Sequence, residues 1–131
     1  MDRTKIGIIG CGAISATYLK NCSLLFDNIV PAAVADLVIE RAQARAAEFG
    51  IEKACTVDEL LASPDLTIVL NLTIPKAHGE ISRRVLGAGK HVYVEKPLAV
   101  RTEEAREIVG IAALRVRMPL DFEATYLQLF G

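Results

Sequence analysis

The stretch Lys5-Ile6-Gly7-Ile8-Ile9-Gly10-Cys11-Gly12-Ala13-Ile14-Ser15 decides the fold of this chain. It is an apolar run that ends in closely spaced glycines and passes directly into a helical pattern. A pyrophosphate needs a close backbone and unpaired N–H groups, and glycines at a helix N-terminus supply both. Gly10 can adopt the positive φ of a turn, and Gly12 has no Cβ to hold phosphates away. The stretch therefore predicts a dinucleotide-binding loop, in which Ser15 replaces the third glycine of G-x-G-x-x-G.

A second apolar run, Ile29 to Ala35, ends in Asp36. An acidic residue at the tip of the second strand is where a dinucleotide fold accepts the ribose hydroxyls of the adenosine, and this is the role that we predict for Asp36. The alternative is that Asp36 merely caps the next helix. Leu37 stands where Arg or Ser would favour a 2′-phosphate, so NAD is predicted as the cofactor in preference to NADP.

The composition is that of a soluble globular protein with one domain's length. The 131 residues are 52% hydrophobic and 24% charged, and the net charge of −1 gives no footprint for nucleic acid or an anionic membrane. The three cysteines have no metal-like spacing, so no metal site is predicted and a reduced, cytoplasmic setting is the simplest account. No stretch resembles a signal peptide or a membrane span.

Strands and helices are predicted to alternate along the chain. Strands are expected at Lys5 to Ile9, Ile29 to Ala35, Lys53 to Thr56, Leu66 to Leu72 and His91 to Val94; helices at Ala13 to Phe26, Val38 to Phe49, Thr56 to Ser63, Pro75 to Leu86 and from Thr102 onward. This order is typical of a doubly wound α/β fold with a parallel sheet, a Rossmann fold, in a single domain. Ligands of such sheets bind where strands end, so the candidate residues are 10–15, 36–37, 71–78 and 95–97.

Three motifs at these positions resemble the nucleotide-binding half of the glucose-fructose oxidoreductase / inositol dehydrogenase / rhizopine catabolism (Gfo/Idh/MocA) family. They are Gly10-Cys11-Gly12-Ala13-Ile14-Ser15, Asn71-Leu72-Thr73-Ile74-Pro75-Lys76-Ala77-His78 and Ala88-Gly89-Lys90-His91-Val92-Tyr93-Val94-Glu95-Lys96-Pro97-Leu98-Ala99. The resemblance covers about residues 4 to 109. It implies an NAD(P)-dependent oxidoreductase that moves a hydride between a nicotinamide and a secondary alcohol of a sugar or cyclitol.

The resemblance also implies roles for particular residues. The pyrophosphate and ribose are assigned to Gly10, Gly12, Ala13, Ile14, Asp36 and Leu37; the rest of the cofactor cleft to Asn71, Thr73, Pro75, His78, Glu95, Lys96 and Pro97. Lys96 is the one candidate catalytic residue, because a cation beside the reacting carbon can orient substrate and depress the pKa of a neighbouring acid. Lys96 could instead be a solvated loop lysine, and His78 a satisfied structural histidine. His91 is expected to be structural, in a buried strand.

Relatives of this kind continue into a second domain that supplies the substrate pocket and the acid-base groups, and that domain is absent from this sequence. We therefore expect a dinucleotide-binding domain over residues 1–118 and a divergent apolar tail over 119–131. The last helix is expected to be shortened after about Val109, with a sixth strand from Arg115 to Met118. The tail places Phe122, Tyr126, Leu129 and Phe130 on one helical face, which would fold back, pair with a second copy, or mark a truncated or frame-shifted end.

Two classes of function follow from these patterns. In the first, the chain is the NAD-binding domain of an oxidoreductase, with a polyol or sugar as substrate and little or no turnover by this chain alone. In the second, it is a non-catalytic dinucleotide-binding or oligomerising module whose tail docks on a partner. A cofactor site that has lost its ligand is a third hypothesis. The substrate, the oligomeric state and the nature of the 110–131 end are left open.

Overall fold

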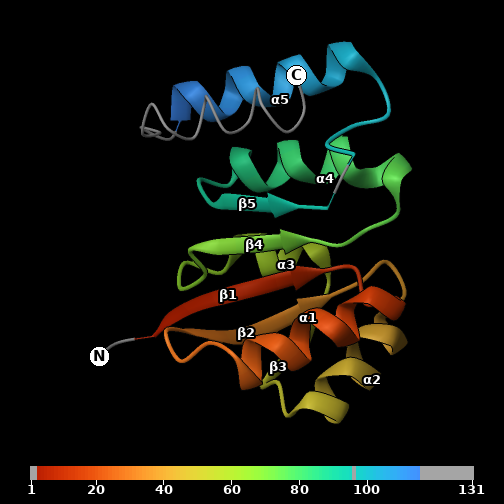
Figure 1. Cartoon of the computed structure of the whole chain (residues 1–131), viewed down its shortest axis with the longest axis vertical. Coiled ribbons are helices and arrows are strands. Elements are labelled where there is room, and N and C mark those ends of the chain that lie inside the picture. Colours follow the sequence, from red (N-terminus) through yellow and green to blue (C-terminus); the bar gives the residue numbers. More distant parts are fainter. Residues whose placement is uncertain (1–2, 96, 116–131) are drawn as a thin grey trace.

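The computed structural model describes residues 3–95 and 97–115, which form a parallel sheet with helices on both faces (Figure 1). The strands are β1 (Thr4–Ile9), β2 (Ile29–Ala35), β3 (Lys53–Cys55), β4 (Ile68–Asn71) and β5 (His91–Val94). The helices are α1 (Ala13–Leu24), α2 (Ile39–Phe49), α3 (Val57–Ala62), α4 (Pro75–Gly87) and α5 (Thr102–Arg115). The order β3-β2-β1-β4-β5, with every pairing parallel, confirms the predicted doubly wound α/β fold.

The strand order reverses at β1. From β1 the chain moves to β2 and β3 on one side, and then crosses to β4 and β5 on the other. The loops that follow β1 and β4 therefore run in opposite directions from the carboxyl edge of the sheet. The glycine loop after β1 lies at this switch point, which is where doubly wound folds bind ligands.

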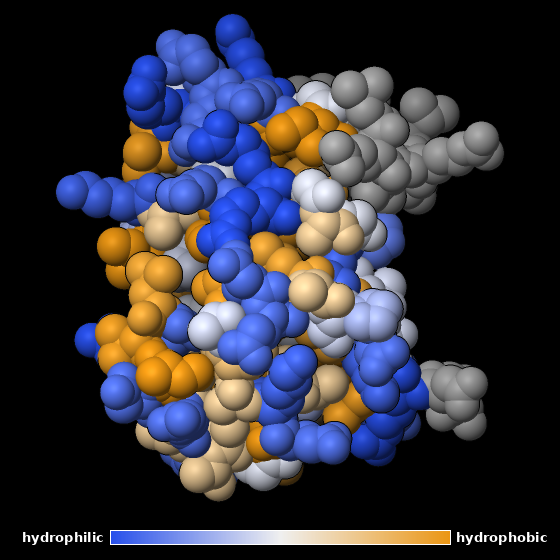
Figure 2. Space-filling view, turned by 180° about the vertical axis from the view of Figure 1, so that it is seen from behind, coloured by the Kyte–Doolittle hydropathy of each residue, from blue (hydrophilic) through white to orange (hydrophobic). Residues whose placement is uncertain are grey.

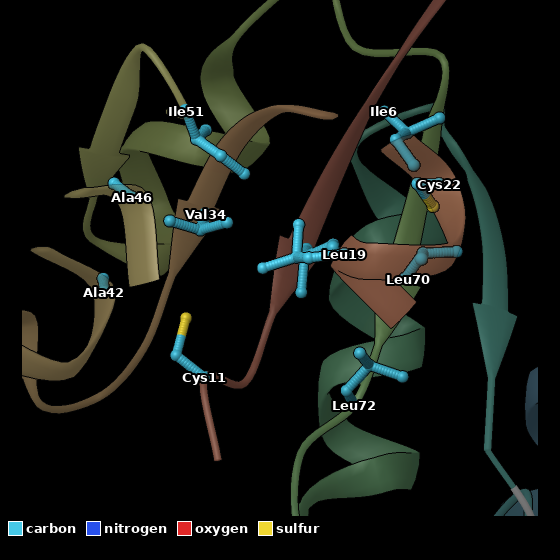
Figure 3. Close-up of a cluster of buried hydrophobic side chains, with 11 residues drawn as sticks. Ile6, Cys11, Leu19, Cys22, Val34, Ala42, Ala46, Ile51, Leu70 and Leu72 are labelled. Carbon is cyan, nitrogen blue, oxygen red and sulfur yellow. The ribbon is translucent and has the colours of Figure 1, made fainter. Parts of the chain in front are cut away.

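Two apolar clusters cover the two faces of the sheet. On one face, Ile6 and Ile8 of β1 and Val34 of β2 pack with Leu19 of α1 and Ala42 of α2 (Figure 3). On the other face, Ile9, Ala33, Ala35, Cys55 and Val69 pack with residues of α3 and α4. Because both faces are covered, β1 has to be apolar on both sides, as its sequence predicted.

Local sequence signals fix several element ends. Thr56 and Glu59 form a capping box at the start of α3: Thr56 Oγ1 accepts from the Glu59 amide at 3.2 Å, and Glu59 Oε1 accepts from the Thr56 amide at 3.3 Å. Pro75 occupies the first turn of α4, where its missing N–H costs nothing. Gly50 ends α2 in the left-handed region, with φ at 67°.

The structure corrects two expectations near the C-terminal end. Helix α5 is not shortened after Val109 but continues to Arg115, packing Ile108 and Ala112 against Leu86 of α4. Arg115 is therefore helical, and the rest of the predicted sixth strand lies outside the described residues, as does the tail over 119–131. The helix continues because Ile108 and Ala112, four residues apart, lie on the face toward α4 and pack there. This packing stabilises a helix over residues in which the sequence shows only a weak strand pattern.

Strand β5 is the other correction. It forms one end of the described sheet, next to β4 only, and its His91 and Tyr93 side chains are exposed rather than buried. Its neighbours Val92 and Val94 are half-buried and pack against the α4 and α5 side. The alternation is that of an edge strand with one face covered, so the expectation that His91 lies in a buried strand was wrong.

A buried lysine lies at the edge of the sheet where the strands begin, opposite the carboxyl edge. Lys90, just before β5, is 5% exposed, and its Nζ donates to the carbonyl oxygens of Ser63 and Leu66 at 2.5 and 2.9 Å. Burial lowers the pKa of this amine, and the nearby Asp65 carboxylate opposes the effect. Lys90 thereby ties the segment between α3 and β4 to the start of β5.

Candidate dinucleotide-binding site

The turn that leaves β1 requires a glycine at position 10. Gly10 has a φ of 103°, as its place in the motif predicted, and its amide donates to the Ala35 carbonyl at 2.8 Å. A Cβ on Gly10 would lie 2.6 Å from the Leu72 carbonyl carbon and oxygen. The turn therefore brings the end of β1 against the loop that follows β4, closer than any side chain permits.

The N-terminus of α1 offers free donors and open space. Gly12, Ala13 and Ile14 are exposed, and within the described part of the chain their amides have no hydrogen-bond partner. A Cβ on Gly12 would meet nothing within 4 Å, so the side from which a ligand approaches is open. Converging N–H groups, the positive end of a helix dipole and the missing side chain fit a pyrophosphate.

Ser15 and Arg45 hold this loop from behind. The Ser15 hydroxyl, fully buried, donates to the Gly12 carbonyl at 2.6 Å. Arg45 of α2 donates through Nε to Ser15 Oγ at 3.0 Å and through a terminal nitrogen to the Gly12 carbonyl at 3.2 Å. The sequence carries no signal for this contact, because helical periodicity shows only which face is apolar, not which neighbour a long polar side chain reaches.

Asp36 joins the first two strand ends. One carboxylate oxygen accepts from the Cys11 amide at 2.7 Å, and the other accepts from the Val38 amide at 2.8 Å. The N-cap of α2 is Val38 rather than Asp36, so capping alone does not account for the carboxylate. A carboxylate has about four lone-pair sites, and two of them stay available on the half-buried Asp36. Leu37 beside it is 87% exposed.

An open hollow of about 600 Å³ begins at Asp36. Its far wall carries Asp58 and Arg84, which form an ion pair with each other. The full lining is Asp36, Leu37, Val38, Ile39, Glu40, Thr56, Val57, Asp58 and Arg84. The lining has three carboxylates and one guanidinium, so the hollow carries a net negative charge. The rest of its lining is mostly apolar. Such a hollow suits an uncharged ring and its ribose better than a further phosphate.

Exposed apolar side chains lie at several points of the carboxyl edge. Figure 2 shows the molecule from behind, with hydrophobic surface gathered along the side on which the strands end. The large exposed apolar side chains at strand ends on this edge are Ile14, Leu37, Val38, Ile74 and Val100. Flat heterocyclic rings bind in such surroundings, so the edge matches a dinucleotide in chemistry as well as in position.

The end of β4 is braced by a buried amide. Asn71 is fully buried; its Nδ2 donates to the His78 carbonyl and to Ser82 Oγ, both at 2.9 Å. Its Oδ1 accepts from the Thr73 amide at 3.3 Å and the Thr73 hydroxyl at 2.6 Å. Every polar atom of Asn71 is therefore used inside the protein, while Pro75 lies exposed at the rim.

His78 is buried beneath the same loop, 2% exposed. Its Nδ1 lies 2.6 Å from the Pro97 carbonyl oxygen, and its Nε2 lies 2.7 Å from the Thr73 carbonyl oxygen. Both ring nitrogens are thus occupied by backbone. The histidine connects the loop after β4 with the loop after β5, two segments that the sequence treated separately.

The end of β5 is held from α1. The Tyr18 hydroxyl donates to Glu95 Oε1, and the Tyr18 ring meets Tyr93 edge-on, with centroids 6.3 Å apart. Burial, and then the Glu95 carboxylate, raise the pKa of Tyr18 well above its ordinary value. Pro97 is exposed, and Lys96 lies outside the described residues. Sequence reasoning missed Tyr18, which carries no motif signal.

Other chemistry is limited in the described residues. Cys11 is buried, its thiol contacts the Ala35 carbonyl, and burial raises its pKa to about 11, so this loop cysteine is a poor nucleophile. No group of three metal-ligating side chains comes together among residues 3–95 and 97–115. None of the helices that the structure describes is long and apolar enough to cross a membrane.

Comparisons with known proteins agree with this geometry. The pattern of the oxidoreductase family with an NAD-binding Rossmann fold, Gfo/Idh/MocA, matches residues 4–118. The inositol 2-dehydrogenase of Pseudomonas savastanoi pv. phaseolicola is 36% identical over 128 residues, which are 95% of this chain and 38% of that protein. The chain thus spans about two fifths of the length of this relative.

Two solved structures are similar in fold. The myo-inositol dehydrogenase of Lactobacillus casei, in complex with NAD(H) and myo-inositol, has a TM-score of 0.81 at 27% identity, covering 88% of this chain and 34% of that one. The 3-ketoreductase KijD10 of Actinomadura kijaniata, in complex with TDP-benzene and NADP, has a TM-score of 0.81 at 29% identity, covering 87% and 35%. Both cofactors thus occur among similar proteins.

Proposed function

Because the chain belongs to the Gfo/Idh/MocA family of oxidoreductases, as its NAD-binding Rossmann domain, we propose that the glycine loop and Asp36 bind NAD(H) at the carboxyl edge of the sheet. The free amides of Gly12, Ala13 and Ile14 would hold the pyrophosphate. Asp36 would accept the adenosine ribose hydroxyls, with the adenine in the hollow beside it. The open amide cluster at the start of α1 is the observation that carries this proposal.

We propose that NAD(H) binds more tightly than NADP(H). A 2′-phosphate would enter the hollow close to Asp36, where Glu40 adds negative charge and Arg84 and Asp58 neutralise each other in an ion pair. Leu37 offers no hydrogen-bond donor there. Repulsion between like charges in a partly buried site costs more than it does in water, so the phosphate is penalised rather than merely unrecognised.

Calorimetric titration with NADH and with NADPH tests both statements. We expect saturable binding of NADH and weaker binding of NADPH. Asp36→Ala should weaken NADH binding by about 10- to 100-fold, the value of hydrogen bonds to a charged group. Asp65→Ala is the matched control, because Asp65 pairs with Lys5 at the other edge of the sheet. A folded wild-type chain that binds neither nucleotide contradicts the proposal.

We propose that the domain serves hydride transfer at a secondary alcohol of a cyclitol or sugar. Similarity to inositol 2-dehydrogenases supports this substrate class. The nicotinamide, when bound, supplies the hydride acceptor or donor. The loops after β4 and β5 would line its pocket through Thr73, Pro75, Glu95 and Pro97, with Asn71 and His78 behind them; Lys96, proposed to touch the reacting centre, lies outside the described residues.

We further propose that residues 1–118 form the dinucleotide-binding unit, with 119–131 as a separate tail, and that this chain turns over little by itself. Hydride transfer needs a substrate wall and a proton-transfer group in near-attack geometry. Assay of the chain on a panel of polyols and sugars with NAD tests the point. Turnover that Lys96→Ala abolishes would overturn the expectation of inactivity and support the catalytic role of Lys96. NADH binding without turnover is the expected result.

A further inference from the structure

The imidazole of His78 is enclosed by two backbone oxygens. The distances are 2.6 Å from Nδ1 to the Pro97 carbonyl and 2.7 Å from Nε2 to the Thr73 carbonyl. A ring turned over by 180° would place carbons at these positions, and C–H···O contacts are longer, about 3.3–3.6 Å between the heavy atoms. The two nitrogens therefore face the two carbonyls.

The number of donors on the ring then matters. A carbonyl oxygen only accepts hydrogen bonds, whereas a neutral imidazole has one N–H and one lone pair. A neutral His78 would turn a nitrogen lone pair toward one of the carbonyl oxygens at hydrogen-bond distance in a buried place. Only the imidazolium form donates to Thr73 and to Pro97 at the same time.

The two acceptors belong to different loops at the carboxyl edge. Thr73 follows β4 and is also held by Asn71; Pro97 follows β5, three residues after Val94. In the other direction, the His78 carbonyl accepts from Asn71 Nδ2. His78 thus joins the braced loop after β4 to the segment that carries Glu95 and Pro97, which has no strand beyond it in the described sheet.

No carboxylate among the described residues is hydrogen-bonded to the His78 ring, so the carbonyls alone receive its protons. The charged and titratable groups on the surrounding elements have other partners or face solvent. On α5, Glu104 lies over Gly79 and pairs with Arg83 of α4; Glu107 also pairs with Arg83. Glu95 is held by Tyr18, Lys76 and Glu80 are exposed on α4, and Lys96 lies outside the described residues.

We propose that His78 is a positioning residue that acts as an imidazolium, clasping the loops after β4 and β5 in the arrangement that binds the nicotinamide half of the cofactor. This rests on the proposed binding of NAD(H). When the ring loses a proton, one of the two contacts is lost and the loop after β5 is released. A His78 ring with a single N–H therefore holds the two loops less firmly and lowers cofactor affinity, although His78 itself is buried away from the cofactor.

Nitrogen NMR of the whole chain tests the clasp without any cofactor. The chain has two histidines, and exposed His91 provides the internal reference for a solvated ring. Long-range ¹H–¹⁵N spectra between about pH 5 and about pH 8 are expected to show both nitrogens of His78 protonated in the acidic part of this range, with slow exchange with water, while the Pro97 segment is ordered. A single neutral tautomer of His78 throughout this range overturns the proposal.

NADH affinity over the same pH range tests the consequence. We expect the dissociation constant of the wild-type chain to be about five- to tenfold higher wherever the spectra show only one protonated nitrogen on His78, because one hydrogen bond is then missing. His78→Gln, whose amide can donate to one carbonyl but not to both, should bind weakly with a flat profile. His91→Gln is the matched control and should keep the wild-type profile.

The outcomes separate the two proposals. If the folded wild-type chain does not bind NADH at any pH, the proposed function fails, and the NMR spectra still decide the protonation of His78. If NADH binds but the pH profile persists in His78→Gln, the clasp is wrong and the proposed function stands. Circular dichroism and thermal melting establish that His78→Gln folds; should it not, the wild-type profile is compared with the ¹⁵N titration, and disagreement between the two curves contradicts the clasp.

Discussion

The loops after β1 and β2 differ from the loops after β4 and β5 in where their polar groups point. At the first pair, no described residue pairs with the amides of Gly12, Ala13 and Ile14, and the contacts described for Asp36 use only two of its lone-pair sites. At the second pair, Asn71, His78 and Glu95 are committed to contacts inside the protein. The loops after β1 and β2 therefore present hydrogen-bond donors and acceptors to a ligand. The loops after β4 and β5 use their polar groups to hold the binding surface in its shape.

This difference implies that substitutions in the two halves fail in different ways. In the half formed by the β1 and β2 loops, a change should weaken cofactor binding and leave the fold intact. In the half formed by the β4 and β5 loops, a change in a polar side chain should first cost stability. The following substitutions test that division.

Asn71→Ala is expected to have the largest effect. It removes four hydrogen bonds and leaves the Ser82 hydroxyl, the His78 carbonyl and the two Thr73 donors without this partner, the first two of them in buried surroundings. We expect a loss of about 3–4 kcal/mol in the free energy of unfolding. Urea unfolding measures it, and Asn21→Ala on the exposed side of α1 is the control. A loss below about 1 kcal/mol would mean that the brace is not needed.

Gly12→Ala should have the opposite signature. Its backbone, with φ of −77° and ψ of −166°, is allowed for alanine, and the new Cβ meets no protein atom within 4 Å. The methyl group instead occupies the space that the pyrophosphate needs, so we expect NADH binding to weaken by about 10- to 30-fold with less than about 1 kcal/mol of lost stability. Gly110→Ala, at an open position of α5, should change neither quantity much. Unchanged NADH affinity in Gly12→Ala would remove the glycine loop as the binding site.

Cys11 should give the smallest effect, and only at alkaline pH. Burial raises the pKa of its thiol from 9.0 to about 11, and the Asp36 carboxylate adds to this. Above pH 9 the unfolded chain loses a proton that the folded chain keeps, so the stabilisation is complete below pH 9 and is lost as pH rises through about 11.

The wild-type chain should therefore lose about 1 kcal/mol near pH 9.5 that Cys11→Ala does not lose. Urea unfolding at about pH 8 and about pH 9.5 measures the difference between the two proteins, which cancels the contributions of Tyr18 and Lys90. An equal pH dependence of the free energy of unfolding in both proteins would show that burial does not raise the pKa of the Cys11 thiol.

The sequence predicted the half of the edge that depends on backbone. The positive φ at Gly10, the open space at Gly12 and the carboxylate at the end of β2 are local requirements. Each of them selects a particular residue type at a particular position, which can be recognised in the sequence. The order of strands and helices followed from periodicity for the same reason, and β2 and β5 have the predicted bounds.

The contacts between distant side chains could not be predicted in the same way. Three such contacts join residues that are 19 to 77 positions apart: Arg45 with Gly12, Tyr18 with Glu95, and His78 with Pro97. The same polar side chains are also common on solvent-exposed surfaces, so their residue types do not predict these contacts. The length of α5 and the exposure of His91 were also misjudged, because both depend on which neighbour packs there: α4 supports α5, and no described strand covers the far side of β5.

The buried Lys90 gives the domain a chemical reporter at the edge away from the proposed cofactor. Its amine is enclosed by the Ser63 and Leu66 carbonyls, whereas Lys5, Lys20, Lys53 and Lys76 are exposed. Acylating or methylating reagents should therefore modify the exposed lysines at once and reach Lys90 only when the segment before β4 swings away from β5. The rate at which Lys90 is labelled thus counts these openings, and its change on adding NADH would show whether tightening one edge of the sheet is felt at the other.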